Sequence, residues 1–249
     1  MNDSIKAVIL KQADYREADA ILTVMTAEYG KLSFIAPGIR KMTSRNAGSL
    51  LPFTETEIQY DHRPGKTMFR LKTARSLRLF RKLHEDLTLS ASAGVIAELT
   101  DVFCMPGDDE TSAEQYELLC SALAFLNEGR DPLAVTGLFA SDMMKMYGIA
   151  PDVDECVRCF STLVSAVSAK EGGFLCAKCA GEAGVPLTSP TALKRFRLLV
   201  KAGLVHYDAV ENAGGIRKED LELLMDMIRL HAGVQIRSFS FFTGLLSIE

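Results

Sequence analysis

The stretch AILTVMTAEYGKLSFIAPG, residues 20–38, decides the fold of the first part of the chain. In it, two runs of β-branched and aromatic residues, ILTVM and LSFIA, lie on either side of Tyr29 and Gly30. Pro37 and Gly38 add a second turn signal after the second run. Short alternating runs bounded by turn residues are typical of strands. The stretch therefore predicts two consecutive β-strands.

Three similar runs in the first eighty residues predict three more strands. Each is short, and turn signals separate it from its neighbours. The five predicted strands are residues 5–10, 20–25, 32–36, 54–60 and 68–77. Five closely spaced strands suit a small closed barrel, for which the OB-fold is the natural candidate and a five-stranded SH3-like barrel the competing assignment.

The period of the apolar residues becomes helical after Arg81. Ser112 and Gln115 fit a capping box at one helix start, and Gly129 fits the end of that helix. Pairs of a capping residue and proline predict two further starts. The predicted helices are residues 84–103, 112–128, 132–147, 190–202 and about 218–232, with loops at 104–111 and 206–217 and an apolar tail at 239–246.

These assignments predict an α+β multidomain chain. Residues 1–80 form an OB-fold nucleic-acid-binding domain, and residues 81–249 form an all-α domain. A four-cysteine zinc motif is inserted in the second domain at residues 156–179.

The zinc motif consists of two C-x2-C turns, Cys156-Val-Arg-Cys159 and Cys176-Ala-Lys-Cys179. Two such turns place four sulfurs around one ion, and Gly172-Gly173 lies where the connecting segment must reverse. A closed four-thiolate site has no open coordination position, which favours one structural Zn²⁺ over a catalytic or DNA-contacting site. An iron site of rubredoxin type uses similar spacing.

The start of the chain lacks a basic segment followed by an apolar one, and no uncharged apolar run approaches the roughly 20 residues of a membrane-spanning helix. We therefore expect a soluble, cytoplasmic protein, whose reducing compartment leaves thiols free for metal. Cys104 and Cys120 lie in apolar helical stretches and are expected in the core.

Charge is divided unevenly along the chain. Residues 1–82 carry a formal balance of +7, residues 83–249 carry −11, and the whole chain has −4. A basic segment joined to an acidic remainder indicates polyanion binding by one part of the molecule.

The basic residues of the barrel segment are candidates for phosphate contact. Those we assign to nucleic-acid binding are Lys31, Arg40, Lys41, Arg45, Arg70 and Lys72. The nearby aromatics Phe34, Tyr60 and Phe69 are expected in the barrel core, although an exposed ring would stack on a base. A second basic stripe, Lys194, Arg197 and Lys201, fits a solvated helix face or a nucleic-acid contact equally well.

No catalytic arrangement is found in the sequence. It has no phosphate-binding glycine loop, nucleophile elbow or H-E-x-x-H motif, so we do not expect an enzyme. A protein-interaction scaffold with a structural zinc site, without DNA binding, is the main alternative. A thiol-based redox or metal sensor is a third hypothesis.

Several motifs, in their order and spacing, resemble the RecO family of recombination mediators. They are Tyr15-Arg-Glu-Ala-Asp19, Glu28-Tyr-Gly-Lys31, Gly38-Ile-Arg-Lys41 with Ser44, the four cysteines, and His231-Ala-Gly-Val-Gln-Ile-Arg-Ser238. Because some members lack the cysteines, this chain resembles the zinc-bearing branch.

The resemblance implies an OB-fold followed by a helical domain with a zinc motif. It also implies a non-enzymatic activity: binding of single- and double-stranded DNA, annealing of complementary strands and, with RecR, loading of RecA onto DNA coated by single-stranded DNA-binding protein (SSB). The basic loop of the family corresponds to Arg40 and Lys41, and the family docks the acidic, apolar tail of SSB on its helical domain. We take Arg237 as the candidate residue for that tail.

Overall fold

The computed structural model describes residues 3–63, 65–105 and 111–246. The chain divides into two compact units, Met1–Gly129 and Arg130–Glu249, which are described separately below. The domain boundary that the sequence predicts after residue 80 lies within the first of these units, and it stays a prediction.

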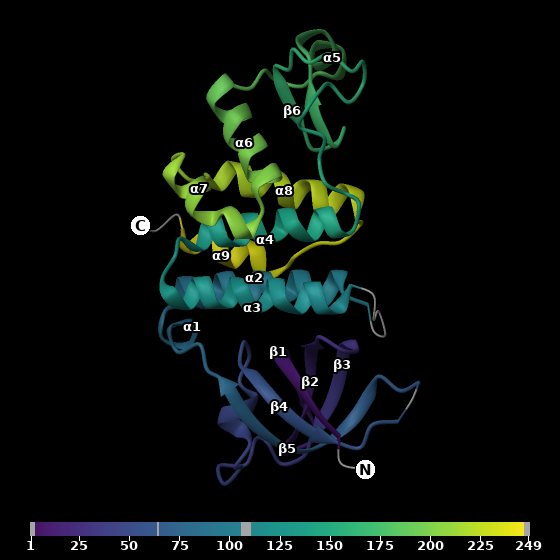
Figure 1. Ribbon diagram of the computed structural model, residues 1–249, viewed down its shortest axis with the longest axis vertical. Helices are drawn as coiled ribbons and strands as arrows, with labels where there is room; N and C mark the ends of the chain where they lie inside the picture. Colours follow the sequence, from purple (N-terminus) through teal and green to yellow (C-terminus); the bar gives the residue numbers. More distant parts are fainter. Residues whose placement is uncertain (1–2, 64, 106–110, 247–249) are drawn as a thin grey trace. The chain divides into compact units, whose positions relative to one another are not determined.

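The first unit contains a closed five-stranded barrel (Figure 1). Its strands are β1 (Asp3–Tyr15), β2 (Asp19–Thr26), β3 (Gly30–Ala36), β4 (Glu55–Tyr60) and β5 (Met68–Arg78). The strand order is β1-β2-β3-β5-β4, and β4 pairs back with β1 to close the barrel. The β3–β5 pair is parallel and the others are antiparallel. This Greek-key barrel confirms the predicted OB-fold over the SH3-like alternative.

Closure depends on a bend in the long first strand. The register of β1 against β2 shifts between Ile9 and Lys11, as in a β-bulge. The half before the shift pairs with β4, and the half after it pairs only with β2. Alternate side chains of all five strands fill the barrel core, which includes Leu22, Phe34 and Tyr60.

Between β3 and β4 runs a long loop that contains the short 3₁₀ turn η1 (Ala47–Leu50). After β5 come α1 (Lys82–Glu85), α2 (Leu87–Phe103) and α3 (Ser112–Glu128), of which α2 and α3 lie side by side (Figure 1). The single helix predicted at residues 84–103 is wrong at its start. Asp86 is extended and accepts a hydrogen bond from the Leu89 N–H at 2.9 Å, so it ends α1 and caps α2.

The predicted capping box at Ser112 is also wrong. Thr111 is the N-cap residue of α3, and the Ser112 hydroxyl donates to the Ala27 carbonyl at 2.7 Å. A tertiary partner has therefore replaced the local one. Gly129 ends the helix in the left-handed conformation, as predicted.

The second unit is mostly helical (Figure 1). Its elements are α4 (Pro132–Met146), β6 (Ala166–Ser168), β7 (Gly173–Leu175), α5 (Ala177–Ala183), α6 (Pro190–Ala202), the 3₁₀ turn η2 (Leu204–His206), α7 (Tyr207–Asn212), α8 (Lys218–His231) and α9 (Ser238–Leu245). The capped starts at Asp131 and Ser189 are confirmed. The loop predicted at residues 206–217 is wrong, because α7 lies within it and buries Tyr207, whose hydroxyl accepts from the Asp131 N–H at 2.8 Å.

Among the described residues, no helix is long and apolar enough to cross a membrane. Cys104 and Cys120 are buried in the core, as predicted. Burial raises the pKa of the Cys120 thiol to about 12.

Candidate nucleic-acid interface and metal centre

A groove of about 1130 Å³ runs over the seam between β3 and β5 of the barrel. The parallel pairing places Ile35 beside Arg70 along this seam. Its lining also includes Arg63 and Lys66 of the β4–β5 loop, and Pro37 and Asn46, which flank the basic loop. The groove thus joins two of the regions for which the sequence predicts phosphate contacts.

Four cations line the groove: Arg63, Lys66, Arg70 and Lys72. In β5 the predicted pair Arg70 and Lys72 is exposed, while Phe69 and Leu71, which alternate with them, are buried, so the two share one face. Asp61, the one acidic residue among the described lining residues, forms an ion pair with Lys72 at 2.5 Å, and this hydrogen bond lowers the pKa of its carboxyl. Arg63 and Lys66 belong to the same groove but were not assigned from the sequence, because nothing local shows that the β4–β5 loop folds over β5.

The loop that follows β3 is fixed at its base and exposed at its tip. Ile39 is buried in the barrel core, and the Gly38 N–H donates to the Asp19 carboxylate at 2.8 Å. The predicted residues Arg40, Lys41 and Arg45 are exposed on this loop. Arg40 also pairs with the Asp14 carboxylate at 3.2 Å, which partly neutralises it.

Lys31 differs from the other five predicted residues. Its side chain is only 18% exposed, and its ammonium lies 3.2 Å from the Asp101 carboxylate of α2. It also donates to the Asp101 backbone carbonyl. Burial raises the pKa of Asp101, but Lys11 and Lys31 more than offset this, so the pKa is lowered overall. The structure therefore places Lys31 in an ion-pair network between the barrel and α2.

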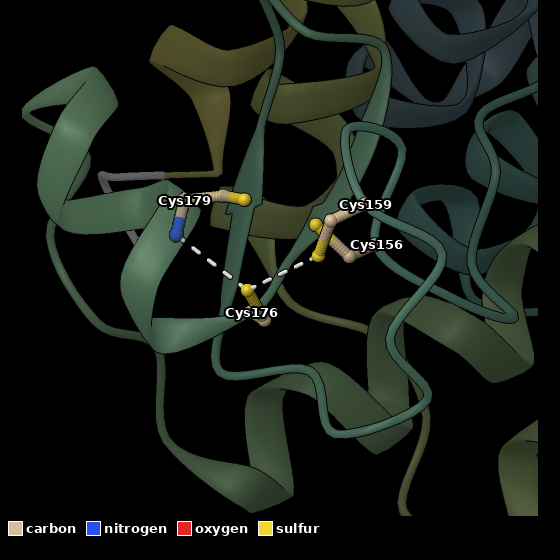
Figure 2. A group of neighbouring side chains, drawn as sticks. All are labelled: Cys156, Cys159, Cys176 and Cys179. Atoms are coloured by element: carbon tan, nitrogen blue, oxygen red, sulfur yellow. Dashed lines mark hydrogen bonds between the residues drawn. The ribbon is translucent and has the colours of Figure 1, made fainter.

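The four cysteines of the second unit converge on one point (Figure 2). Their sulfurs all lie within 4.8 Å of one another, and those of Cys159 and Cys176 are 3.6 Å apart. A tetrahedron of four zinc–sulfur bonds of about 2.3 Å has sulfur–sulfur edges of about 3.8 Å. The cluster is therefore compatible in size and ligand chemistry with a metal ion.

The electrostatics of the cluster also favour a cation. Burial raises the pKa of Cys156, but backbone N–H groups outweigh it and the pKa falls to about 6. Burial and the neighbouring thiols raise the pKa of Cys179 to about 12. Four thiolates this close repel one another, so a divalent ion is needed to hold all four deprotonated.

Ion pairs and hydrogen bonds attach the metal-binding segment to the helices of its own unit. Asp154 accepts from Arg197 at 2.7 Å and from Lys201 at 2.5 Å, both on α6. His231, at the end of α8, lies 2.7 Å from the Ala169 carbonyl. Two members of the basic stripe on α6 thus bind the segment that carries Cys156.

A smaller hollow of about 340 Å³ lies between α8 and α9. Arg237, the predicted partner-binding residue, lines it together with Arg229, the acidic Glu222 and Asp226, and the apolar Met225, Ile236 and Phe239. Its lining thus combines charged groups of both signs with apolar side chains.

Two family models match most of the chain. Residues 1–80 match the model described as Recombination protein O N terminal, and residues 84–239 match Recombination protein O C terminal. The DNA repair protein RecO of Anaeromyxobacter sp. (strain K) is 32% identical over 243 residues, which cover 95% of this chain and 94% of that protein. The DNA repair protein RecO of Shouchella clausii is 30% identical over 247 residues, covering 96% and 93%. That of Bacillus subtilis is 27% identical over 253 residues, covering 98% and 95%. The chain therefore belongs to the RecO family of DNA repair and recombination proteins.

Proposed function

We propose that this chain is a non-enzymatic recombination mediator that binds single- and double-stranded DNA on its barrel and anneals complementary strands. The observation that carries the proposal is the groove over the β3–β5 seam, lined by four cations and one carboxylate that is already paired. Ammonium and guanidinium groups bind phosphates and release condensed counterions, so affinity falls with salt. In OB-folds, the face of strands 2 and 3 and the β4–β5 loop bind oligonucleotides, and the groove includes Ile35 of β3 and Arg63 and Lys66 of that loop.

The same charges give a physical route to annealing. Two complementary strands repel through their phosphates, and cations that neutralise part of this charge lower the repulsion before base pairs form. The groove and the basic loop with Lys41 and Arg45 offer two neighbouring sets of cations on one barrel. We propose that the chain uses them with RecR to load RecA onto SSB-coated single strands in the nucleoid.

We propose further that the four cysteines hold one structural zinc ion. Four thiolates complete a tetrahedral shell, so no position remains for water or substrate. The core around Cys156 and Cys179 is small, and small cores depend on a metal for stability. Zinc would therefore hold a segment that Arg197 and Lys201 attach to α6.

The hollow between α8 and α9 is our proposed site for the acidic, apolar tail of SSB. Arg237 supplies positive charge for a carboxylate, while Arg229 is already paired with Asp226, and Ile236 and Phe239 supply apolar contacts.

Annealing of complementary oligonucleotides coated with SSB, with and without the protein, tests the proposal. Two double variants, Arg40→Glu with Lys41→Glu and Lys66→Glu with Arg70→Glu, should weaken DNA binding and slow annealing. Each loss of two single-strand phosphate contacts should lower the slope of log affinity against log salt by about 1.4.

The matched control is Lys170→Glu with Lys178→Glu, which changes the net charge equally at two exposed positions of the second unit outside the candidate DNA contacts. It should leave DNA binding unchanged. Normal annealing by both folded barrel variants would refute the site assignment. Absence of DNA binding by the unsubstituted chain at low salt would instead favour the protein-interaction scaffold.

A further inference from the structure

Three aromatic rings form a continuous stack at the surface of the barrel, beside the groove. His62 stacks on Tyr29 with ring centroids 4.9 Å apart and an interplanar angle of 25°. Its other face stacks on Phe69 at 5.7 Å and 23°. Phe69 is buried and lines the groove, so the stack runs from the groove wall outward to Tyr29.

Tyr29 is the outer, solvent-exposed end of this stack. Its residue is 38% exposed, although one ring face is covered by His62. The parts of the ring that His62 leaves uncovered are the opposite face and the edge. Phe34, Tyr60 and Phe69 are buried, as predicted, whereas Tyr29, which the sequence marks only as a turn residue and as part of a family motif, is exposed.

The stack is fixed before any ligand binds. The Tyr60 hydroxyl and Nδ1 of the His62 ring form a hydrogen bond at 3.1 Å. The backbone N–H of His62 donates to the Asp3 carboxylate at 3.2 Å. The Tyr29 N–H donates to the Thr26 hydroxyl at 3.2 Å in the β2–β3 turn. A ring held in this way loses little conformational freedom on binding.

We infer that the outer face of Tyr29 is a stacking site for an unpaired nucleobase. The inference rests on the proposed DNA binding and adds a contact to bases. A base would continue the ladder of Phe69, His62 and Tyr29 at the spacing the rings already have. Phosphates on either side of that base would remain within reach of the groove, whose lining includes Arg63 of the neighbouring β4–β5 loop.

This site distinguishes single strands from duplex. Bases in a duplex are stacked on each other and offer no free face, whereas those of a single strand do. Glu28 precedes Tyr29 and Asp3 bonds to His62, so the surroundings of the ring are not basic. Stacking on Tyr29 should therefore contribute to affinity without changing its dependence on salt.

The test measures affinity for single-stranded and duplex oligonucleotides of equal length by fluorescence anisotropy over a range of salt concentrations. Tyr29→Ala should weaken single-strand binding by about 5- to 150-fold, the range of one lost base–aromatic stack. Duplex binding and the salt slope should not change. Tyr29→Phe keeps the ring and should bind as the unsubstituted chain does.

Phe160→Ala is the matched control, because it removes an aromatic residue that is 70% exposed in the second unit. It should have no effect on either DNA. Equal single-strand affinity of Tyr29→Ala and the unsubstituted chain would overturn the stacking site but leave the proposed function standing. An equal loss for duplex would overturn it as well. Failure of the unsubstituted chain to bind DNA would overturn both.

A second measurement does not depend on truncating the side chain. The chain contains no tryptophan, so Tyr29→Trp introduces a single reporter. Single-stranded DNA should quench its fluorescence by stacking, and duplex should not. Unchanged tryptophan emission in a variant that binds single strands with normal affinity would refute the inference.

Discussion

The ion pair between Arg195 of α6 and Asp220 of α8 allows a quantitative test of how the second unit is held together. The two side chains are 16% and 6% exposed. The Asp220 carboxylate accepts two hydrogen bonds from the guanidinium and a third from the Arg217 N–H at 2.8 Å. Asp220→Asn removes the charge and leaves the guanidinium buried without an anion. Breaking one side of a buried pair costs about 3–5 kcal/mol of unfolding free energy, and we expect about 3 because asparagine can still cap α8.

The control is Asp226→Asn on the same helix. Asp226 and Arg229 pair at 3.1 Å, but their side chains are 57% and 52% exposed, so water already screens the pair. Its loss should cost less than about 1 kcal/mol. Both free energies are measured by urea unfolding followed by circular dichroism at neutral pH. The reasoning is refuted if Asp220→Asn costs no more than Asp226→Asn. In a double-mutant cycle, Arg195→Met should cost much less in the Asp220→Asn background than in the unsubstituted chain, because no paired charge remains to be broken.

Three further perturbations have defined outcomes. The pKa of Asp101 is lower in the folded chain than the value of about 3.9 of an unfolded aspartate, so its stabilisation is complete above about pH 4 and is lost as the pH falls through the folded pKa. Asp101→Asn should therefore lower the melting temperature at neutral pH and leave a smaller loss on acidification, which thermal melts across this pH range measure. Gly203→Ala should destabilise the second unit by about 1–3 kcal/mol, because Gly203 has φ 74° and ψ 169° and a Cβ there would lie 2.6 Å from the Asp142 carboxylate. Chemical unfolding checks this value, and an unchanged midpoint would contradict it. Removal of metal by a chelator should make residues 152–185 sensitive to limited proteolysis while single-strand binding by the barrel persists, and resistance of this segment without metal would argue against a structural ion.

The barrel could be predicted because its signals are local. Alternating side chains and turn residues mark each strand, and the structure extends the predicted runs by only a few residues at most ends. The parallel pairing of β3 with β5 could not be predicted, since it joins residues far apart in the sequence. The groove lies over that pair of strands, so only part of its lining could be predicted from the sequence.

The helix errors have the same origin. The apolar pattern continues through Asp86, although this residue ends one helix and caps the next. Ser112 has the sequence of a capping residue, but the Ala27 carbonyl of the β2–β3 turn takes its hydroxyl. In both cases the sequence pattern is satisfied by two structures, and tertiary contacts select between them.

The two kinds of site residue differ in predictability for a physical reason. Cysteine ligands act through fixed spacing within two short turns, so their convergence can be inferred from the sequence. A cation acts through whatever charge lies beside it, and that neighbour is often remote. Lys31 meets Asp101 of α2, and Arg197 meets Asp154 before the first cysteine turn. Basic residues that look equivalent in sequence therefore have different roles in the fold.

Some cations of the chain are paired with carboxylates and others are not, and this difference explains how a chain with a net charge of −4 can bind a polyanion. Net charge is a poor guide, because at physiological salt a charge is screened beyond about 8 Å and DNA responds to the charges within that distance. Among the described residues that line the groove, the one carboxylate, Asp61, is paired with Lys72, which leaves Arg63, Lys66 and Arg70 as the excess positive charge. Lys31 adds little to that excess because it is already neutralised by Asp101. The affinity of the barrel should thus be set by a few unbalanced cations in one concave surface, whose field the low-dielectric walls concentrate.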